Sequence, residues 1–161
     1  MISEYKHILL IGKPCMIHED FIPSMDLFCR YLELAKCKAS INSSYRENSD
    51  HVQGAVVIPA VKSNHFVGHA IDCNIIDSKN IEWSSEMLLV FAKESQKYNS
   101  QINNDVLMLI NLVRRCTLIR WGGDFHPDKN GNIDTVHFDN AMNIKNPARW
   151  EEIYKELHPA T

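Results

Sequence analysis

The chain has 161 residues, of which 45% are hydrophobic and 23% charged, and it contains only 6 Gly and 6 Pro. These values exclude a collagen-like, low-complexity or disordered chain and predict one globular domain spanning residues 1–161. The formal net charge of −3 provides no broad basic surface for a nucleic acid or an anionic membrane. We therefore expect no nucleic-acid partner.

The longest apolar stretches of the chain are short. Neither residues 8–11 nor residues 87–92 approach the roughly 20 residues that a membrane-spanning helix requires. The first stretch ends at Gly12 without a small-residue cleavage site, so we expect no signal peptide and synthesis in the cytoplasm. The five cysteines include no C-x-x-C pair, which predicts reduced thiols rather than disulfides or a thiolate metal cluster.

In the first half of the chain, apolar residues at helical spacing predict an amphipathic helix over residues 24–38. Residues 39–42 are expected to be extended and to lead into a polar loop over residues 43–50. A β-branched run covers residues 54–61, and residues 68–76 alternate between polar and apolar in the manner of a strand.

Two further helices are predicted over residues 84–98 and 104–116, and Asn103 or Asn104 is the expected cap of the second. A short strand over residues 117–121 should follow and end at a pair of glycines. The order of these elements places strands between helices rather than in a separate block.

The last quarter of the chain begins with a hairpin signal at Asn130-Gly131, after which residues 133–139 are the expected returning strand. Asn146-Pro147 starts the last predicted helix, which has one apolar face. Helices and strands are interspersed, yet hairpin signals are present. The predicted fold class is therefore α+β, with a small, mainly antiparallel sheet flanked by helices.

Eight histidines raise the question of a metal site. Five of them stand among polar neighbours and are expected to be ordinary surface residues: His7, His18, His51, His126 and His158. His65 differs, because it lies shortly before Gly68 and a predicted strand that carries a carboxylate, and metal ligands are best held on rigid elements.

That carboxylate is Asp72. In a strand, Asp72 shares one face with Ala70 and Asn74, and the small Ala70 leaves space for an ion. His69 and Cys73 belong to the opposite face, so we expect each of them to pack or to lie at the surface rather than to bind a metal.

A second candidate segment contains Asp134 and His137. In an ideal strand these two side chains face opposite sides, so joint action requires a bend, or a strand that starts after Asp134. With that condition met, His137 completes a zinc set with His65 and Asp72, and the fourth position stays open. Asp134 would then reach the water molecule at the open position.

Two other metal motifs are excluded by spacing. The chain contains no H-E-x-x-H, which excludes a zinc site on a single helix. Asp128, Asn130 and Asn132 imitate the start of a calcium loop, but Ile133 occupies the position that requires Gly, and Asp139 replaces the final Glu. A hairpin explains that stretch better.

Two separated motifs resemble the signature of the D-alanyl-D-alanine carboxypeptidase and L-alanyl-D-glutamate endopeptidase family of zinc peptidases. They are Ser63-x-His65-x-x-Gly68-x-Ala70-x-Asp72 and Asp134-x-x-His137-Phe138. Two weaker matches lie in the expected order, residues 41–46 with the family's Ser-Gly-Tyr-Arg segment and residues 121–125 with its Gly-Gly-Asp-Trp segment. The resemblance covers roughly residues 25–140 and implies the fold shared by lysostaphin-like peptidases and the hedgehog signalling domain.

Position by position, the resemblance implies that His65, Asp72 and His137 bind zinc and that Asp134 is the catalytic carboxylate. Arg46 would contact a substrate carboxylate or the oxyanion. Ser63 and Asp124 are further candidates for substrate binding. The sequence departs from the family pattern at three positions, where Ser44 replaces a Gly, Phe125 a Trp and Asp139 a frequent Glu.

The implied function is a zinc-dependent peptidase that cuts peptidoglycan stem peptides, with the bond between L-Ala and D-Glu as the first choice. Removal of a terminal D-Ala by a carboxypeptidase is the close alternative, and a catalytically silent zinc-bearing binding module is an alternative of another class. Without a signal peptide, such a protein would reach the cell wall as a phage lysis enzyme or as a secreted antibacterial effector. An effector would add an immunity protein as partner.

Overall fold

The computed structural model describes residues 1–47, 62–92 and 103–159. It is an α+β fold, as predicted, and its main sheet is antiparallel except at one edge. The strand order is β2-β4-β5-β8-β7, and β6 pairs with part of β5. These strands are β2 (Leu10–Gly12), β4 (Lys38–Ser43), β5 (Ala70–Ile76), β6 (Glu82–Trp83), β7 (Arg120–Trp121) and β8 (His137–Asp139). The parallel pair is β2 and β4.

A separate antiparallel pair, β1 (Ile2–Glu4) and β3 (Met16–His18), lies near the N-terminus. Three of the described helices, α1 (Ile22–Leu34), α3 (Asn104–Arg114) and α5 (Pro147–Leu157), are longer than two turns. The other described helical elements are single turns: η1 (Glu19–Phe21), η2 (Asn64–Val67), α2 (Ser85–Leu88), η3 (Leu89–Phe91), η4 (Gly122–Asp124) and α4 (Met142–Lys145).

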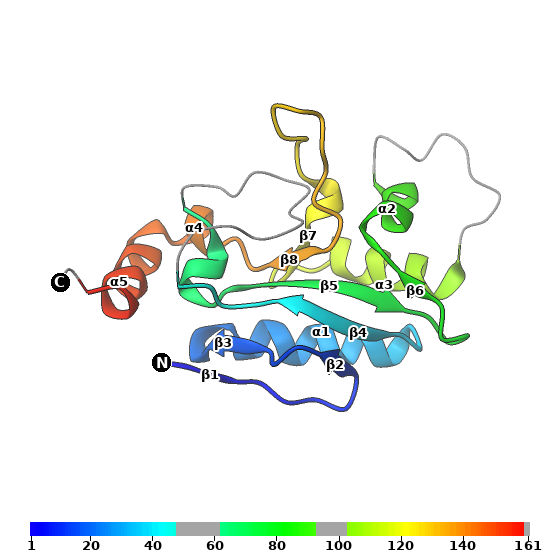
Figure 1. Cartoon of the computed structure of the whole chain (residues 1–161), viewed down its shortest axis with the longest axis horizontal. Helices are drawn as coiled ribbons and strands as arrows, with labels where there is room; N and C mark the ends of the chain where they lie inside the picture. The colour runs from blue at the N-terminus through cyan, green and yellow to red at the C-terminus, as the bar shows by residue number, and fades with distance from the viewer. Residues whose placement is uncertain (48–61, 93–102, 160–161) are drawn as a thin grey trace.

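The two faces of β5 have different surroundings. Ile71, Cys73 and Ile75 are fully buried in the main core, to which α1 and α3 contribute residues such as Phe28 and Leu109. Figure 1 shows α1 and α3 running along the sheet. Alternate residues of β5 point to the other face, where Asp72 lies, as the strand pattern predicted. Helices α1 and α3 therefore pack on one face of the sheet, and the candidate site lies on the other.

A smaller core fastens the C-terminal helix α5 to the short helix η2. It consists of Phe66 and Val67 from η2 and Trp150 and Ile153 from α5. This last helix was predicted from its apolar face, and the side chain of its cap, Asn146, accepts a hydrogen bond from Arg149 N at 3.2 Å. Among the described residues, no helix has the length and hydropathy needed to cross a membrane.

Several predicted boundaries differ from the structure. The first helix begins at Ile22, two residues early, because Pro23 fits the first turn, where its missing N–H has no partner to lose. It ends at Leu34 rather than at residue 38, since Lys36 adopts a φ of 57° and turns the chain into β4. The described part of the helix predicted over residues 84–98 is one turn of α-helix followed by a 3₁₀ turn that ends at Phe91, and residues 93–98 lie outside the described residues.

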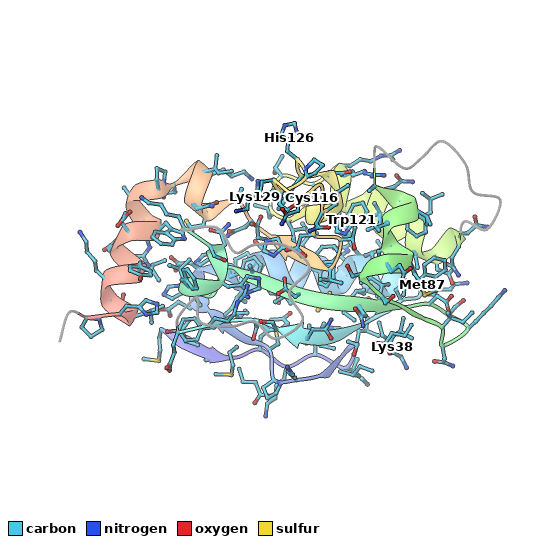
Figure 2. All side chains as sticks on the ribbon, turned by 45° about the horizontal axis from the view of Figure 1, so that its top comes forward. Lys38, Met87, Cys116, Trp121, His126 and Lys129 are labelled. Carbon is cyan, nitrogen blue, oxygen red and sulfur yellow. The ribbon has the colours of Figure 1, made fainter. Side chains whose placement is uncertain are left out.

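The strands of the second half are shorter than predicted. Only residues 120–121 of the segment 117–121 are in a strand, and only 137–139 of the segment 133–139. The hairpin is also wider than predicted, because β7 and β8 pair across a long connection and Gly131 belongs to a turn within it, with a φ of 81°. This connection projects from the sheet (Figure 1), and Figure 2 shows His126 pointing outward from it. The predicted strand over 54–61 lies outside the described residues.

Candidate metal centre and active site

His65 is positioned by the short helix η2. The Ser63 side chain caps this helix by accepting a hydrogen bond from His65 N at 3.3 Å. The helix ends at Gly68, whose φ of 68° suits a residue without a side chain. A Cβ at Gly68 would also lie 2.6 Å from His18 N, so the turn that leads from His65 into β5 requires glycine.

Asp72 and His137 are brought together by strand pairing. They are direct partners in the register between β5 and β8. Strand β8 begins at His137, and the His137 N–H donates to the Asp134 carbonyl at 3.3 Å, so the chain turns immediately before the strand. This geometry satisfies the condition stated for joint action, namely a strand that starts after Asp134.

The three predicted ligands converge on one point. His65 Nε2 lies 3.0 Å from Asp72 Oδ1, His137 Nδ1 lies 3.1 Å from the same oxygen, and the two ring nitrogens are 3.2 Å apart. Ligand atoms about 2.0 Å from a tetrahedral zinc ion are about 3.3 Å from one another. The donor set of two imidazoles and one carboxylate therefore fits a zinc ion in both chemistry and spacing.

The opposite nitrogen of each imidazole is engaged by an oxygen. His65 Nδ1 donates to the Ser44 carbonyl at 2.6 Å, and His137 Nε2 donates to Asp139 Oδ2 at 3.1 Å. A hydrogen bond of this kind fixes the ring orientation and leaves the other nitrogen free to bind a metal. His65 therefore presents Nε2 and His137 presents Nδ1.

The electrostatics of this cluster favour a positive charge at its centre. Burial raises the pKa of Asp72, but His65 and His137 outweigh it and hold that pKa well below its usual range. Burial lowers the pKa of His137, but its hydrogen bonds to Asp139 and Asp72 raise that pKa above the ordinary value. A divalent cation bound here would supply the positive charge that a proton on His137 supplies otherwise.

Asp134 lies beside this cluster in a loop that several contacts hold. Thr135, the next residue, accepts a hydrogen bond from Trp121 Nε1 at 2.6 Å through its carbonyl and donates through its hydroxyl to the Ser85 carbonyl at 2.6 Å. A Cβ at Gly122 would lie 2.1 Å from the Asp134 carbonyl oxygen, so the loop passes directly over a glycine.

The environment of the Asp134 carboxyl differs from that of Asp72. Burial is the largest influence on Asp134 and raises its pKa above the ordinary value, and the negative charge of Asp72 acts in the same direction. The charges of His137, His65 and Arg46 oppose this effect. A carboxyl group with a raised pKa beside a metal centre suits general acid-base chemistry.

Arg46 follows β4 and reaches the same cluster. Its backbone N–H donates to the His65 carbonyl at 3.1 Å, and its Nη2 lies 3.8 Å from Asp72 Oδ2. Burial lowers the pKa of Arg46, while Asp72 and Asp134 raise it. Its Nε is buried and has no hydrogen-bond partner within the described part of the chain. The guanidinium therefore retains donors for a carboxylate or an oxyanion.

Ser63 and Asp124, the other two candidates for substrate binding, have structural contacts. Ser63 caps η2 as described above. The Asp124 carboxylate accepts hydrogen bonds from Arg114 Nε at 2.8 Å and Nη2 at 2.7 Å, which fastens η4 to α3. Their roles in substrate binding stay predictions.

A second group of possible ligands contains His18, Asp20 and His69. His18 is buried, so its prediction as a surface residue is wrong; β3 carries its ring inward to stack on His69. Most of the possible ligand atoms of this group are already engaged, although His69 Nε2 is buried without a hydrogen-bond partner among the described residues. His18 Nδ1 accepts from Asp20 N at 3.2 Å, the Asp20 carboxylate is held by Arg149 at 2.8 Å, and His69 Nδ1 accepts from the Asn140 amide at 2.9 Å. This group is therefore the poorer metal site of the two.

Among the described residues, neither group of possible ligands includes the remaining histidines. His7 and His126 are exposed, as predicted. His158 is half-buried rather than a simple surface residue, because its ring stacks on Tyr154 and donates to the Phe66 carbonyl at 2.9 Å. His51 lies outside the described residues.

Sequence reasoning missed the residues that support the ligands. Asp139 was noted only as a departure from the family pattern, although residues two apart in a strand share a face, and this rule could have placed it beside His137. The Asn64 contact to Asp139, at 2.8 Å, joins residues 75 positions apart, and no local pattern indicates it.

Comparisons with known proteins extend this description. A protein-family model described as D-alanyl-D-alanine carboxypeptidase matches residues 59–140, which is about half of the chain. Among solved structures, the chain is similar to the L-Ala D-Glu endopeptidase ChiX of Serratia marcescens. The sequence identity is 16% and the TM-score 0.43, and the match covers 79% of this chain and 82% of that chain. No curated protein has significant similarity to the chain.

Proposed function

The chain belongs to the D-alanyl-D-alanine carboxypeptidase family, and we propose on that premise that it is a zinc-dependent peptidase that hydrolyses a bond in peptidoglycan stem peptides. One observation supports this proposal above the others. Three ligand atoms of His65, Asp72 and His137 lie within 3.0 to 3.2 Å of one another.

His65, Asp72 and His137 would hold the zinc ion. When bound, zinc supplies a Lewis acid that polarises a carbonyl group and makes water more acidic. Three protein ligands would leave a fourth position of the ion open, which is typical of catalytic rather than structural zinc sites. The family match and the donor set support zinc as the metal, but other divalent ions with the same ligand preference are the alternatives that metal analysis distinguishes.

Asp134 is the proposed general base. Its carboxylate accepts the proton of the attacking water, and the resulting carboxylic acid donates that proton to the leaving amine. Burial raises the pKa of this carboxyl above its ordinary value, which improves it as a proton acceptor and donor near neutral pH. General acid-base catalysis of this kind typically contributes about 10² to 10⁴ in rate.

Arg46 is the proposed anion-binding group. Its Nε has no partner among the described residues, and its Nη2 is 3.8 Å from Asp72, which is too far for a strong hydrogen bond. A substrate carboxylate, or the oxyanion that forms during attack, would occupy these donors. Both a terminal D-Ala and a D-Glu residue carry a carboxylate, so Arg46 suits either of the candidate substrates.

The bond between L-Ala and D-Glu is the first choice, because the Gly122-Gly123-Asp124 segment together with Asp134 resembles the endopeptidase branch of the family. Cleavage of terminal D-Ala is the alternative and agrees with the description of the matching family model. A silent zinc-binding module is disfavoured, since such a module has no use for a half-buried Asp134 beside the ligands.

The cell wall is the proposed place of action, after release by phage lysis or by an antibacterial secretion machine. In the second case an immunity protein would protect the producing cell. Protection of a producing cell by the product of a neighbouring gene would distinguish the secreted effector from the phage lysis enzyme.

The test is mass spectrometry of purified muropeptides after incubation with the protein. We expect product peaks that disappear with a chelator and return with added zinc. Asp134→Ala should lose most turnover, whereas Glu33→Ala, which removes an exposed carboxylate from α1, should retain it. Undiminished cleavage by Asp134→Ala would contradict the proposed mechanism, and the absence of products from the zinc-loaded wild type would favour the binding module.

A further inference from the structure

Asp139 is the most heavily bonded buried carboxylate near the candidate metal centre. It is 2% exposed, and its two oxygens together accept five hydrogen bonds. Its Oδ2 accepts from His137 Nε2 at 3.1 Å, Asn64 Nδ2 at 2.8 Å and Arg120 Nη2 at 3.0 Å. Its Oδ1 accepts from Arg120 Nε at 2.5 Å and Ala141 N at 3.0 Å. The guanidinium of Arg120 balances the negative charge of this carboxylate. The proposed mechanism assigns no role to Asp139.

The bond from His137 determines which ring nitrogen is available to a metal. A carboxylate only accepts hydrogen bonds, so the proton of the neutral His137 ring lies on Nε2. The lone pair of Nδ1 is then directed at the point shared with His65 Nε2 and Asp72 Oδ1. In the opposite tautomer, an N–H would point to that place and exclude a metal ion.

Asn64 extends the same arrangement to the other imidazole ligand. Its amide nitrogen donates to Asp139, and its amide oxygen accepts from Asn143 N at 3.0 Å. Asn64 is the residue immediately before His65 in η2. The two histidines come from a short helix and a strand far apart in sequence, and the Asp139 carboxylate links the two elements.

Phe125 and Arg120 close the other side of this arrangement. The Arg120 guanidinium lies 4.3 Å from the centroid of the Phe125 ring, which in turn meets the His137 ring edge to face at 5.8 Å. The position of the guanidinium that neutralises Asp139 is thus fixed by packing as well as by hydrogen bonds.

We propose that Asp139 is a positioning residue for the metal centre. It holds His137 in the tautomer that presents Nδ1, and through Asn64 it links β8, which carries His137, to η2, which carries His65. The inference rests on the proposed zinc function, since it concerns the same site. Supporting partners of this kind commonly change metal affinity by about 10- to 100-fold when they are removed.

The experiment measures zinc affinity directly, by competition with a chromophoric chelator, in the wild type and in Asp139→Asn and Asp139→Ala. We expect the dissociation constant for zinc to rise about 10- to 100-fold in both variants. The matched control is Asp77→Asn, which also removes a buried carboxylate that accepts several hydrogen bonds, here from Trp83 Nε1 and Asn103 Nδ2, but lies outside the ligand contacts. The control should bind zinc as the wild type does, even if its melting temperature falls.

A second readout reports the tautomer. In ¹H–¹⁵N spectra of the zinc-loaded wild type, His137 should show a proton on Nε2 that exchanges slowly with water, and Asp139→Ala should lose this protection. Zinc affinity and Nε2 protection equal to the wild type in both Asp139 variants would overturn the inference while leaving the proposed function intact. A wild type that binds no zinc at all would instead overturn the proposed function.

Discussion

Arg46 offers a prediction at the scale of a single residue. We expect Arg46→Ala to lower kcat/KM on muropeptides by about 10²-fold, because a buried anion would lose charged hydrogen bonds worth roughly 1.5–3 kcal/mol. Arg46→Lys should restore little of this loss, since a single ammonium group does not replace the planar fork of the guanidinium. Steady-state kinetics of the two variants, at equal zinc content, provide the measurement. Kinetics of Arg46→Ala equal to those of the wild type would show that Arg46 binds no substrate group.

Most residues of the candidate site could be predicted from the sequence, because they belong to short local motifs. His65 and Asp72 stand seven positions apart around one turn, and the alternation of the strand correctly placed Asp72 away from the core. The supporting contacts were less accessible, since Asn64 and Asp139 meet only through strand pairing and helix docking. The prediction of His18 as a surface residue is wrong for a related reason, because polar neighbours in the sequence do not indicate that the fold buries this side chain.

At the scale of elements, the loop that carries Asp134 depends on Gly122. A Cβ at this position would lie 2.1 Å from the Asp134 carbonyl oxygen and 3.0 Å from the His137 Cβ. Because the nearest atom belongs to the backbone, the loop itself would have to move to relieve the clash. We expect Gly122→Ala to displace this loop and to reduce turnover at least tenfold, because a small misplacement of a catalytic group has a large effect on rate.

The control for this prediction is Gly131→Ala, in the same long connection. A Cβ at Gly131 has no neighbour within 4 Å, although its φ of 81° makes the substitution slightly strained. This variant should keep its turnover even if it is less stable. Equal activity of Gly122→Ala and the wild type, measured on muropeptides, would show that the close approach at Gly122 does not control the position of the loop that carries Asp134.

Elements with their own end signals were predicted well. Asn103 caps α3 by accepting hydrogen bonds from the N–H groups of Asp105 and Val106, and this helix was found within two residues of its predicted end. The strand predicted over residues 133–139 is longer than the observed strand, because long-range contacts from Trp121 and Ser85 hold its first half in the loop that carries Asp134. Hydrophobic patterning contains no information about such contacts.

At the scale of the whole molecule, the sheet separates two buried histidine environments. The Asp72 face carries the candidate metal centre, and His69 lies fully buried at the start of the opposite face, against His18. Burial lowers the pKa of His69 to about 4, and His18, Asp20 and Arg149 are the charged or titratable groups that act on it from β3, η1 and α5. The fold therefore contains a neutral imidazole at neutral pH.

This environment predicts an acid-sensitive stability in the metal-free protein. The pKa of His69 is about 4 when folded and near 6.5 when unfolded, so the unfolded state binds the proton first as the pH falls. Above about pH 6.5 His69 causes no loss of stability, but the free energy of unfolding falls as the pH drops from 6.5 toward 4, and the loss reaches roughly 3 kcal/mol at pH 4. The lowered pKa of Asp20 acts in a separate window, below its ordinary value of 3.8.

Urea denaturation between pH 7 and pH 4, with chelator present, checks this prediction. The wild type should lose stability across the window, and His69→Gln should lose less over the same range because it carries no titrating group there. Parallel pH profiles for the two proteins would show that His69 does not contribute to the acid sensitivity.

The fold class was predicted from the alternation of helical and strand patterns together with the hairpin signals, and the antiparallel sheet confirms it. The parallel pairing of β2 with β4 was not predicted, because β2 is only three residues long and has no alternation to show. Packing at this scale depends on which faces meet, and residues far apart in the chain decide that.

The central claim is that His65, Asp72 and His137 bind one zinc ion and that Asp134 acts beside them without binding it. Elemental analysis of the purified, zinc-equilibrated protein tests this claim most directly. We predict about one zinc per chain for the wild type and for Asp134→Ala, and almost none for His137→Ala. A wild type without zinc, or a His137→Ala variant that retains a full equivalent, would contradict it.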